Sequence, residues 1–262
     1  MFGKLMSSLG LQSVKIDTVI HNPAVYAGQT VRGEVRLTGV DQAKQINGIS
    51  LQLMTIAEVE SGDHEFNQPL VLQEWSLAQR FELAAQQALV LPFQFELPHE
   101  TPVTEVSCRR NSSRVWLHTH LDVDWGLDAK DRDFLQVHPT PAVRAFLQAM
   151  PQCGLLLDSV DVEKGQLRGR GFQSTIGCYQ EFEFVPAQFG RINEVEVSFV
   201  VQPEQTHVML EIDRKLRGDQ LPAAMQLPDQ HARRYFDVIK ISGVGAMADG
   251  VDRRERITGR LG

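Results

Sequence analysis

The chain has 262 residues, of which 42% are hydrophobic, and it carries a formal net charge of −7. This length holds two ordinary domains or one large domain with a sizeable core, and the composition is not that of a disordered chain. The negative charge argues against a general nucleic-acid binder, because phosphate binding depends on clustered cations and on the counterions that they release.

The three cysteines, Cys108, Cys153 and Cys178, are odd in number and lack CxxC spacing. This usage predicts reduced thiols rather than a disulfide framework. No apolar run approaches the roughly 20 residues that a membrane-spanning helix needs, and residues 1–12 lack the cleavage pattern of a secretory signal. We therefore expect a cytoplasmic localisation.

The first residues of the chain hold a short apolar pattern. One helical face carries Phe2, Leu5, Met6 and Leu9. Residues 2–11 are therefore a candidate helix for weak membrane contact or partner binding. Only Lys4 is present to attract anionic lipid, which favours a cap packed on a domain over a membrane anchor.

The first half of the chain shows the period-2 alternation of half-buried strands. We expect strands over residues 14–20, 31–37, 49–53, 71–75 and 91–97. A turn is expected around Gly28, and the polar stretch Ser61–Pro69 predicts a loop. Residues 77–89 favour a helix by propensity alone, but the strand bracketed by Pro92 and Pro98 favours a loop before it. Residues 98–113 then form a connection.

The stretch from residue 114 to residue 151 organises the chain. Val115–Trp125 alternates strictly, with one apolar face and one face of Trp116, His118, His120, Asp122 and Asp124. The charged residues 128–133 interrupt the alternation and predict an acidic turn. A short helix follows, because Thr140 is a suitable N-cap, Pro141 suits the first helical position and Pro151 ends the apolar pattern.

The second half of the chain returns to short alternating segments. Strands are expected over residues 155–162, 166–170, 178–185, 195–201, 207–213 and 235–241. The many short strands with Gly, Pro and polar turns between them predict an all-β protein built from β-sandwiches.

Several of these segments also resemble known families. Residues 26–33, 91–98, 115–117 and 128–131 resemble the amino-terminal domain of arrestin-like proteins. Residues 180–186 and 211–214 are similar to the bacterial sporulation-control family known as stage-zero M. The resemblance covers roughly residues 10–245, in order and spacing. It implies arrestin-like (immunoglobulin-like) sandwiches and a regulatory or scaffolding role, with no catalytic residues to transfer and no cofactor.

The resulting domain prediction has four parts. Residues 1–138 form an N-terminal arrestin-like β-sandwich, residues 139–151 the connecting helix, residues 152–245 a C-terminal β-sandwich and residues 246–262 a mobile tail. The tail is expected because its composition turns to Gly, Asp and Arg with few apolar residues.

Two groups of residues are candidate sites. His118, His120, Asp122 and Asp124 share one strand face, and because strand neighbours two residues apart are roughly 6 to 7 Å apart, two of them, His118 and His120, could bind a divalent metal. Four in a row cannot converge on one ion, and no third ligand can be named from elsewhere in the sequence. A solvated polar face is the favoured alternative. The charged residues Asp128, Lys130, Asp131 and Arg132, with Asp133, could form an inter-domain ion-pair network like the release switch of arrestins. An exposed acidic turn is the favoured alternative.

Other motifs are set aside. The Gly243-Val244-Gly245 run lacks the helix and second strand of a dinucleotide site, and no catalytic signature is present. Two functions follow as hypotheses. The first is a non-enzymatic adaptor that binds partner proteins through exposed sheet edges and an inter-domain groove. The second is a metal- or ligand-binding protein that uses His118 and His120.

Overall fold

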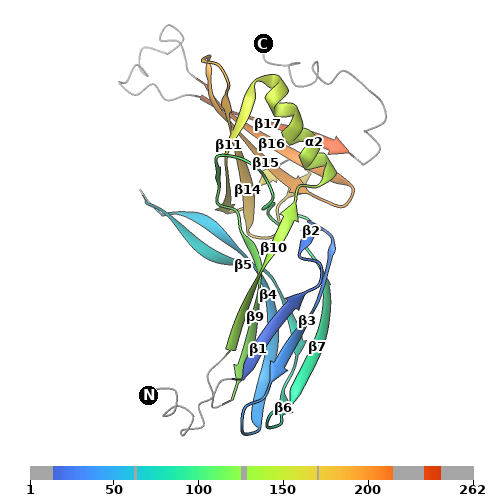
Figure 1. Ribbon diagram of the computed structural model, residues 1–262. Helices are drawn as coiled ribbons and strands as arrows, with labels where there is room; N and C mark the ends of the chain where they lie inside the picture. Colours follow the sequence, from blue (N-terminus) through green and yellow to red (C-terminus); the bar gives the residue numbers. More distant parts are fainter. Residues whose placement is uncertain (1–13, 62–63, 125–128, 170, 215–232, 243–262) are drawn as a thin grey trace.

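The computed structural model describes residues 14–61, 64–124, 129–169, 171–214 and 233–242. The candidate helix at residues 2–11, the expected tail at residues 246–262 and Asp128 lie outside them. The described chain is almost entirely β-structure with one short helix (Figure 1), so the all-β fold class is confirmed. No helix among the described residues is long and apolar enough to span a membrane.

The N-terminal half is a sandwich of two sheets. Its strands are β1 (Lys15–Ile20), β2 (Ala24–Tyr26), β3 (Thr30–Thr38), β4 (Lys44–Ser61), β5 (His64–Ala78), β6 (Phe81–Leu83), β7 (Ala88–Glu96), β9 (Val115–Val123) and β10 (Ala129–His138). The two-residue strand β8 (Arg110–Asn111) precedes β9 in the sequence but pairs with β11 (Leu155–Lys164) of the C-terminal half. One sheet has the order β1-β3-β7, and the other places β4 between β5 and β9, with β10 and β2 beyond β9. Apolar side chains of both sheets form one buried core.

The expected alternation of β9 explains its place in that core. Val115, Leu117, Thr119, Leu121 and Val123 are all buried, as predicted. Trp116 is only 2% exposed although it points to the opposite face, because Arg132 and Phe134 of β10 lie against its ring. The outer face of this sheet is therefore partly covered by its own side chains.

The helix forms as its sequence predicts. Helix α2 (Pro141–Ala149) has Thr140 as its N-cap, whose side chain accepts a hydrogen bond from the Val143 N–H. Pro151 does not end the helical path, since a 3₁₀ turn, η1 (Met150–Cys153), follows. Gly154, at φ 75°, closes this turn in the left-handed conformation that glycine adopts without strain.

The described C-terminal half is built on one antiparallel sheet. Its elements are β11 (Leu155–Lys164), β12 (Arg168–Gly169), β13 (Phe172–Gln173), β14 (Cys178–Pro186), β15 (Ile192–Val201), β16 (Gln205–Arg214) and β17 (Arg233–Ser242). The strand order is β11-β14-β15-β16-β17, and one parallel pair, Glu163↔Glu58, joins β11 to β4, so that the sheet continues into the N-terminal half. Helix α2 and the connection at residues 103–108 cover its apolar face, where Phe182, Phe184 and Val197 are buried.

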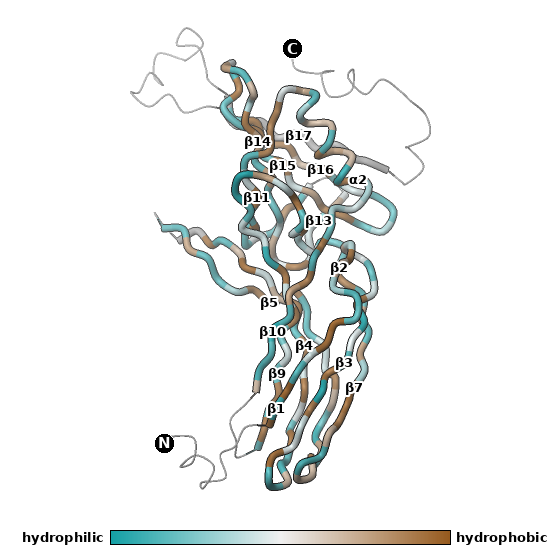
Figure 2. Tube along the Cα trace, viewed as in Figure 1, coloured by the Kyte–Doolittle hydropathy of each residue, from teal (hydrophilic) through white to brown (hydrophobic). Residues whose placement is uncertain are grey.

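Three sequence-based expectations were wrong. The polar stretch 61–69 is not a loop, because its described residues belong to β4 and β5, which pair as a two-stranded ribbon as far as Ser61↔His64. Figure 1 shows this ribbon leaving the body of the molecule at the left, and Figure 2 shows its outer end as mostly hydrophilic. At the outer end of the ribbon the residues of β5 from His64 to Asn67 are all exposed, so this end shows no period-2 pattern, whereas Ala57 of β4 is buried in a small cluster with Val162 and Cys178. The expected strand at 166–170 is reduced to the two residues of β12, which pair with β13.

The acidic turn at 128–133 was also wrong, because residues 129–133 belong to strand β10. They pair with β9 from Ala129↔Leu121 to Asp133↔Leu117. Charged residues fill this part of the strand because one of its faces lies in solvent and the other meets the edge of β1 instead of the core.

Candidate functional site

The predicted histidine and aspartate residues lie on the outer face of β9, and each has its own neighbour. His118 Nδ1 lies 3.1 Å from the carbonyl oxygen of Asp131, and partial burial lowers the pKa of His118. Asp122 accepts a hydrogen bond from the Asn47 side chain, and Asp124 lies 3.9 Å from Arg80. A metal site at His118 and His120 stays a prediction.

The predicted polar cluster is part of the N-terminal sandwich. Asp131 Oδ2 accepts a 2.6 Å hydrogen bond from the Thr18 N–H and so joins β10 to the edge of β1. Burial, with the nearby charges of Asp131 and Asp17, raises the pKa of Asp133 to about 6. Lys130 and Arg132 point to the opposite, outer face. The hydrogen bond from Thr18 to Asp131 thus stabilises the sandwich edge.

The junction between the halves is held by a buried amide instead. Gln180, 8% exposed, accepts a hydrogen bond from the Val103 N–H and donates to the Val103 carbonyl and to Ser113 Oγ. A junction cavity lined by Val103, Gln180 and residues of α2 measures about 30 Å³, which is room for about one water molecule. The described junction is therefore closely packed.

An ion-pair network lies on the same connection. Arg109 and Arg110 both donate to Asp158, at 2.8 to 3.0 Å. These hydrogen bonds, that of Arg109 first, hold the pKa of Asp158 below its usual value. Arg110 Nη2 also lies 3.8 Å from Glu183, which accepts a hydrogen bond from Ser159. Sequence reasoning missed this network because its partners are almost 50 residues apart.

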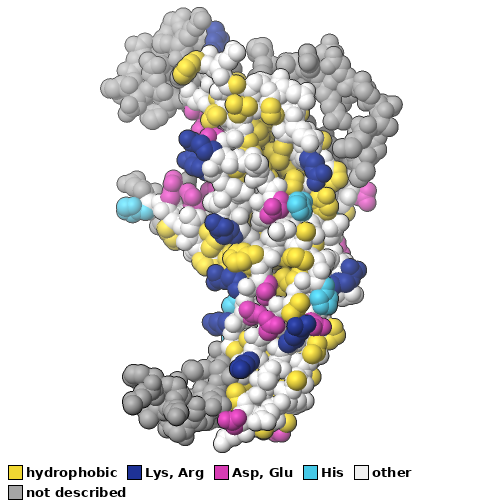
Figure 3. All heavy atoms as spheres, viewed as in Figure 1, with side chains coloured by type: hydrophobic (Ala, Val, Ile, Leu, Met, Phe, Trp, Pro, Cys, Tyr) yellow, Lys and Arg dark blue, Asp and Glu magenta, His cyan; other side chains and the backbone are white. Residues whose placement is uncertain are grey.

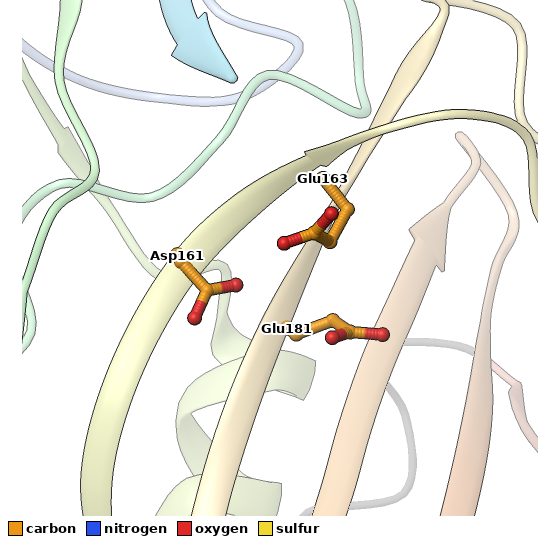
Figure 4. Close-up of side chains that lie close together, drawn as sticks. All are labelled: Asp161, Glu163 and Glu181. Atoms are coloured by element: carbon orange, nitrogen blue, oxygen red, sulfur yellow. The ribbon is translucent and has the colours of Figure 1, made fainter. Parts of the chain in front are cut away.

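A second group that sequence reasoning missed lies on the outer face of the C-terminal sheet. Ligand atoms of Asp161, Glu163 and Glu181 all lie within 4.8 Å of one another. Figure 4 shows the three side chains close together on β11 and β14, with the carboxylates of Asp161 and Glu163 turned toward one another. The register places Asp161 directly opposite Glu181. It is the one such group of three or more His, Cys, Asp or Glu residues in the part of the chain that the structure describes.

Crowding changes the protonation of this carboxylate cluster. Burial, with the neighbouring charges of Glu196 and Asp161, raises the pKa of Glu181 to about 8. Burial, with Glu183 and Glu58 nearby, raises the pKa of Asp161 to about 6. At neutral pH Glu181 is therefore mostly protonated, and its carboxyl O–H can donate a hydrogen bond to a neighbouring carboxylate. Three carboxylates are also the oxygen ligands that Ca²⁺ or Mg²⁺ would take.

The sequence did carry a signal for this cluster. Acidic residues alternate with buried apolar residues in both strands, as Asp161 and Glu163 do in β11 and Glu181 and Glu183 in β14. Alternation places each pair on the outer face. What alternation could not give is the register that sets Asp161 against Glu181.

Comparisons with known proteins agree over most of the chain. The family model Spo0M, described as "SpoOM protein", matches residues 2–216. The sporulation-control protein Spo0M of Bacillus subtilis is 30% identical over 220 residues, which cover 83% of this chain and 82% of that protein. The crystal structure of Spo0M from Bacillus subtilis superposes with a TM-score of 0.73 at 27% identity, covering 88% of this chain and 91% of the other. The chain therefore belongs to the Spo0M family.

Proposed function

We propose that this protein is a non-enzymatic cytoplasmic adaptor in sporulation control or a related regulatory process, and that it binds partner proteins by adding a strand to an exposed sheet edge. The name of the Bacillus subtilis relative, a sporulation-control protein, supports the regulatory part of this proposal. The observation that carries the binding part is the β4–β5 ribbon.

Strand β5 offers a long edge. It pairs with β4 from Ile49↔Ala78 to Ser61↔His64, and its other edge pairs with no strand among the described residues. An unpaired edge presents main-chain N–H and C=O groups that another strand can bind. Phe66 and Val71, 47% and 42% exposed, add apolar contacts along this edge. Pro69 interrupts the row of N–H donors, as proline does on edge strands that must not self-associate freely.

The experiment compares proteins that co-purify from a lysate of the native host with the wild type and with two proline variants, Glu65→Pro and Phe66→Pro. Adjacent residues of an edge strand alternate between facing the paired strand and facing the free edge. One proline therefore removes a hydrogen bond to β4, and the other blocks only the free edge. We expect the variant that keeps wild-type stability to lose the bound proteins. Recovery of the same proteins with both variants would contradict edge binding.

A further inference from the structure

A row of apolar residues crosses the outer face of the N-terminal sheet. The strand register sets Val71 opposite Met54, Met54 opposite Trp116, and Trp116 opposite Phe134. Directly opposed residues point to the same face of a sheet, so the four side chains form a continuous row across β5, β4, β9 and β10. Val71 is 42% exposed and Phe134 55%, while Trp116 closes the middle at 2%.

Basic residues flank this row on both sides. The next outward row on one side sets Arg132 opposite His118 and continues through Gln52 to Glu74 on β5. The row beyond it sets Lys130 opposite His120. On the other side Arg114 precedes the first residue of β9 and is exposed. Figure 3 shows Lys, Arg and His side chains beside hydrophobic ones along the left of the N-terminal half, where β4, β9 and β10 lie.

These cations are available to a partner. Arg114, Lys130 and Arg132 are exposed, and none of them takes part in a salt bridge found among the described residues. The Arg132 guanidinium lies 5.0 Å from the centre of the Trp116 ring, which holds it flat against the row. Over β9 and β10 the border is positive in a chain whose net charge is −7, whereas on β5 the acidic Glu74 accepts a hydrogen bond from the Gln52 side chain.

The dimensions of the row suit an α-helix lying across the strands. Neighbouring strands are about 4.8 Å apart, so a row across four strands spans about 14 Å. One helical turn rises about 5.4 Å, so three successive apolar positions at i, i+4 and i+7 match the row. The rows of cations lie about 7 Å away along the strands, where the flanks of such a helix would place acidic side chains.

We propose that this face, the row of Val71, Met54, Trp116 and Phe134 with its border of Arg114, Arg132 and Lys130, binds an acidic amphipathic helix of a partner protein. The inference rests on the proposed role as a binding protein, but the surface is a sheet face that shares only Val71 with the proposed binding edge of β5. A flat row with its tryptophan covered gives a helix a surface to pack on, whereas insertion into a membrane requires apolar groups that protrude.

The test uses three labelled peptides of 18 residues and fluorescence anisotropy. One is an acidic helix with Leu at i, i+4 and i+7 and Glu on both flanks, one has Lys in place of Glu, and one keeps the acidic composition with the Leu positions scrambled. We expect the wild-type chain to bind the first peptide at least about tenfold more tightly than the other two. Equal binding of all three, or binding of none, would overturn the proposal.

Matched variants locate the binding. Phe134→Ser and Arg132→Glu should each weaken binding of the acidic peptide about tenfold or more. The controls are Phe189→Ser, another exposed phenylalanine, and Arg144→Glu, another arginine packed on an aromatic ring, here Tyr26 at 5.8 Å. The controls should bind as the wild type does. All four variants alter exposed side chains, and circular dichroism verifies that they fold.

Two further measurements test whether lipid or the N-terminal segment binds this face instead of a partner helix. If the wild type sediments with phosphatidylglycerol vesicles and Phe134→Ser does not, the face binds lipid and the protein-helix proposal is wrong. If removal of residues 1–13 raises affinity for all three peptides equally, the N-terminal segment occupies the face and the proposal is likewise wrong. Loss of peptide binding in Phe134→Ser with unchanged recovery of edge-bound proteins would leave the β5 proposal intact.

Discussion

The outer faces of the N-terminal and C-terminal parts of the large sheet carry their charged residues in opposite arrangements. On the N-terminal sheet, cations lie apart and exposed, and Arg132 rests on the ring of Trp116. On the C-terminal sheet, carboxylates crowd together, and burial with like charges raises the pKa of Glu181 to about 8 and that of Asp161 to about 6. Arg114, Lys130 and Arg132 of the N-terminal face are exposed to solvent, whereas on the C-terminal face burial and like charges favour the protonated form of Glu181 and Asp161.

The unfolding of the two halves can be followed by different spectroscopic signals. The three tryptophans, Trp75, Trp116 and Trp125, all precede residue 139, so tryptophan fluorescence reports on the N-terminal half. Circular dichroism reports on the strands of both halves. Substitutions in each region should therefore affect the two signals differently.

The largest effect is expected for Gln180→Ala. The substitution leaves the buried Val103 N–H and carbonyl and Ser113 Oγ without the amide that now bonds them. The free energy of unfolding should fall by about 2 to 4 kcal/mol. In urea unfolding the circular dichroism midpoint should fall further than the fluorescence midpoint. Gln136→Ala, at an exposed position of β10, is the control and should change neither by more than about 0.5 kcal/mol.

The next effect tests the carboxylate cluster through Glu181→Gln. The folded-state pKa of Glu181, about 8, lies above its ordinary value of 4.5, so the folded protein binds this proton more tightly than the unfolded chain does. The stabilisation is complete below pH 4.5 and is lost as the pH rises through 8. The variant should therefore be more stable than the wild type by about 1 to 3 kcal/mol at pH 9, with the difference vanishing at pH 4.

Thermal unfolding at the two pH values measures this difference. Glu74→Gln, an exposed carboxylate on β5, serves as the control for removing one negative charge. A Glu181→Gln variant that is no more stable at pH 9 than at pH 4, relative to the wild type, would show that the cluster remains ionised in the fold.

A smaller effect is expected on the cationic face. Arg132→Gln removes the guanidinium from the Trp116 ring and should lower the free energy of unfolding by about 0.5 to 1 kcal/mol. The tryptophan emission maximum should shift to longer wavelength, because the ring, now 2% exposed, gains contact with water. Arg114→Gln removes a cation from the same face without this ring contact. If the two variants shift emission equally, the stacking of Arg132 has no effect of its own.

The sequence predicts a strand or helix well where that segment faces a core. The alternation of Val115 to Val123 and the cap of Thr140 predicted β9 and α2, because burial and capping impose patterns on local sequence. Residues 61–69 and 129–133 were missed, because an exposed ribbon and a strand against a polar edge impose none. The apolar row and the carboxylate cluster were missed because both depend on which residues of neighbouring strands lie opposite one another. The sequence of one strand does not determine that register.

The smallest effect concerns His118, whose Nδ1 lies 3.1 Å from the Asp131 carbonyl. Partial burial lowers its pKa below 6.5, and the neighbouring charges of Lys130, His120 and Arg132 act in the same direction. The folded protein thus prefers the neutral ring, and its contribution to stability, complete above pH 6.5, is lost as the pH falls. Relative to the wild type, His118→Gln should gain stability between pH 7.5 and pH 5.5, but only slightly, because solvent screens a ring this exposed. Thermal unfolding measures this gain, with His64→Gln, an exposed histidine on β5, as the control. An equal gain in stability for both variants would mean that the effect comes from net charge and not from the position of His118 on the outer face of β9.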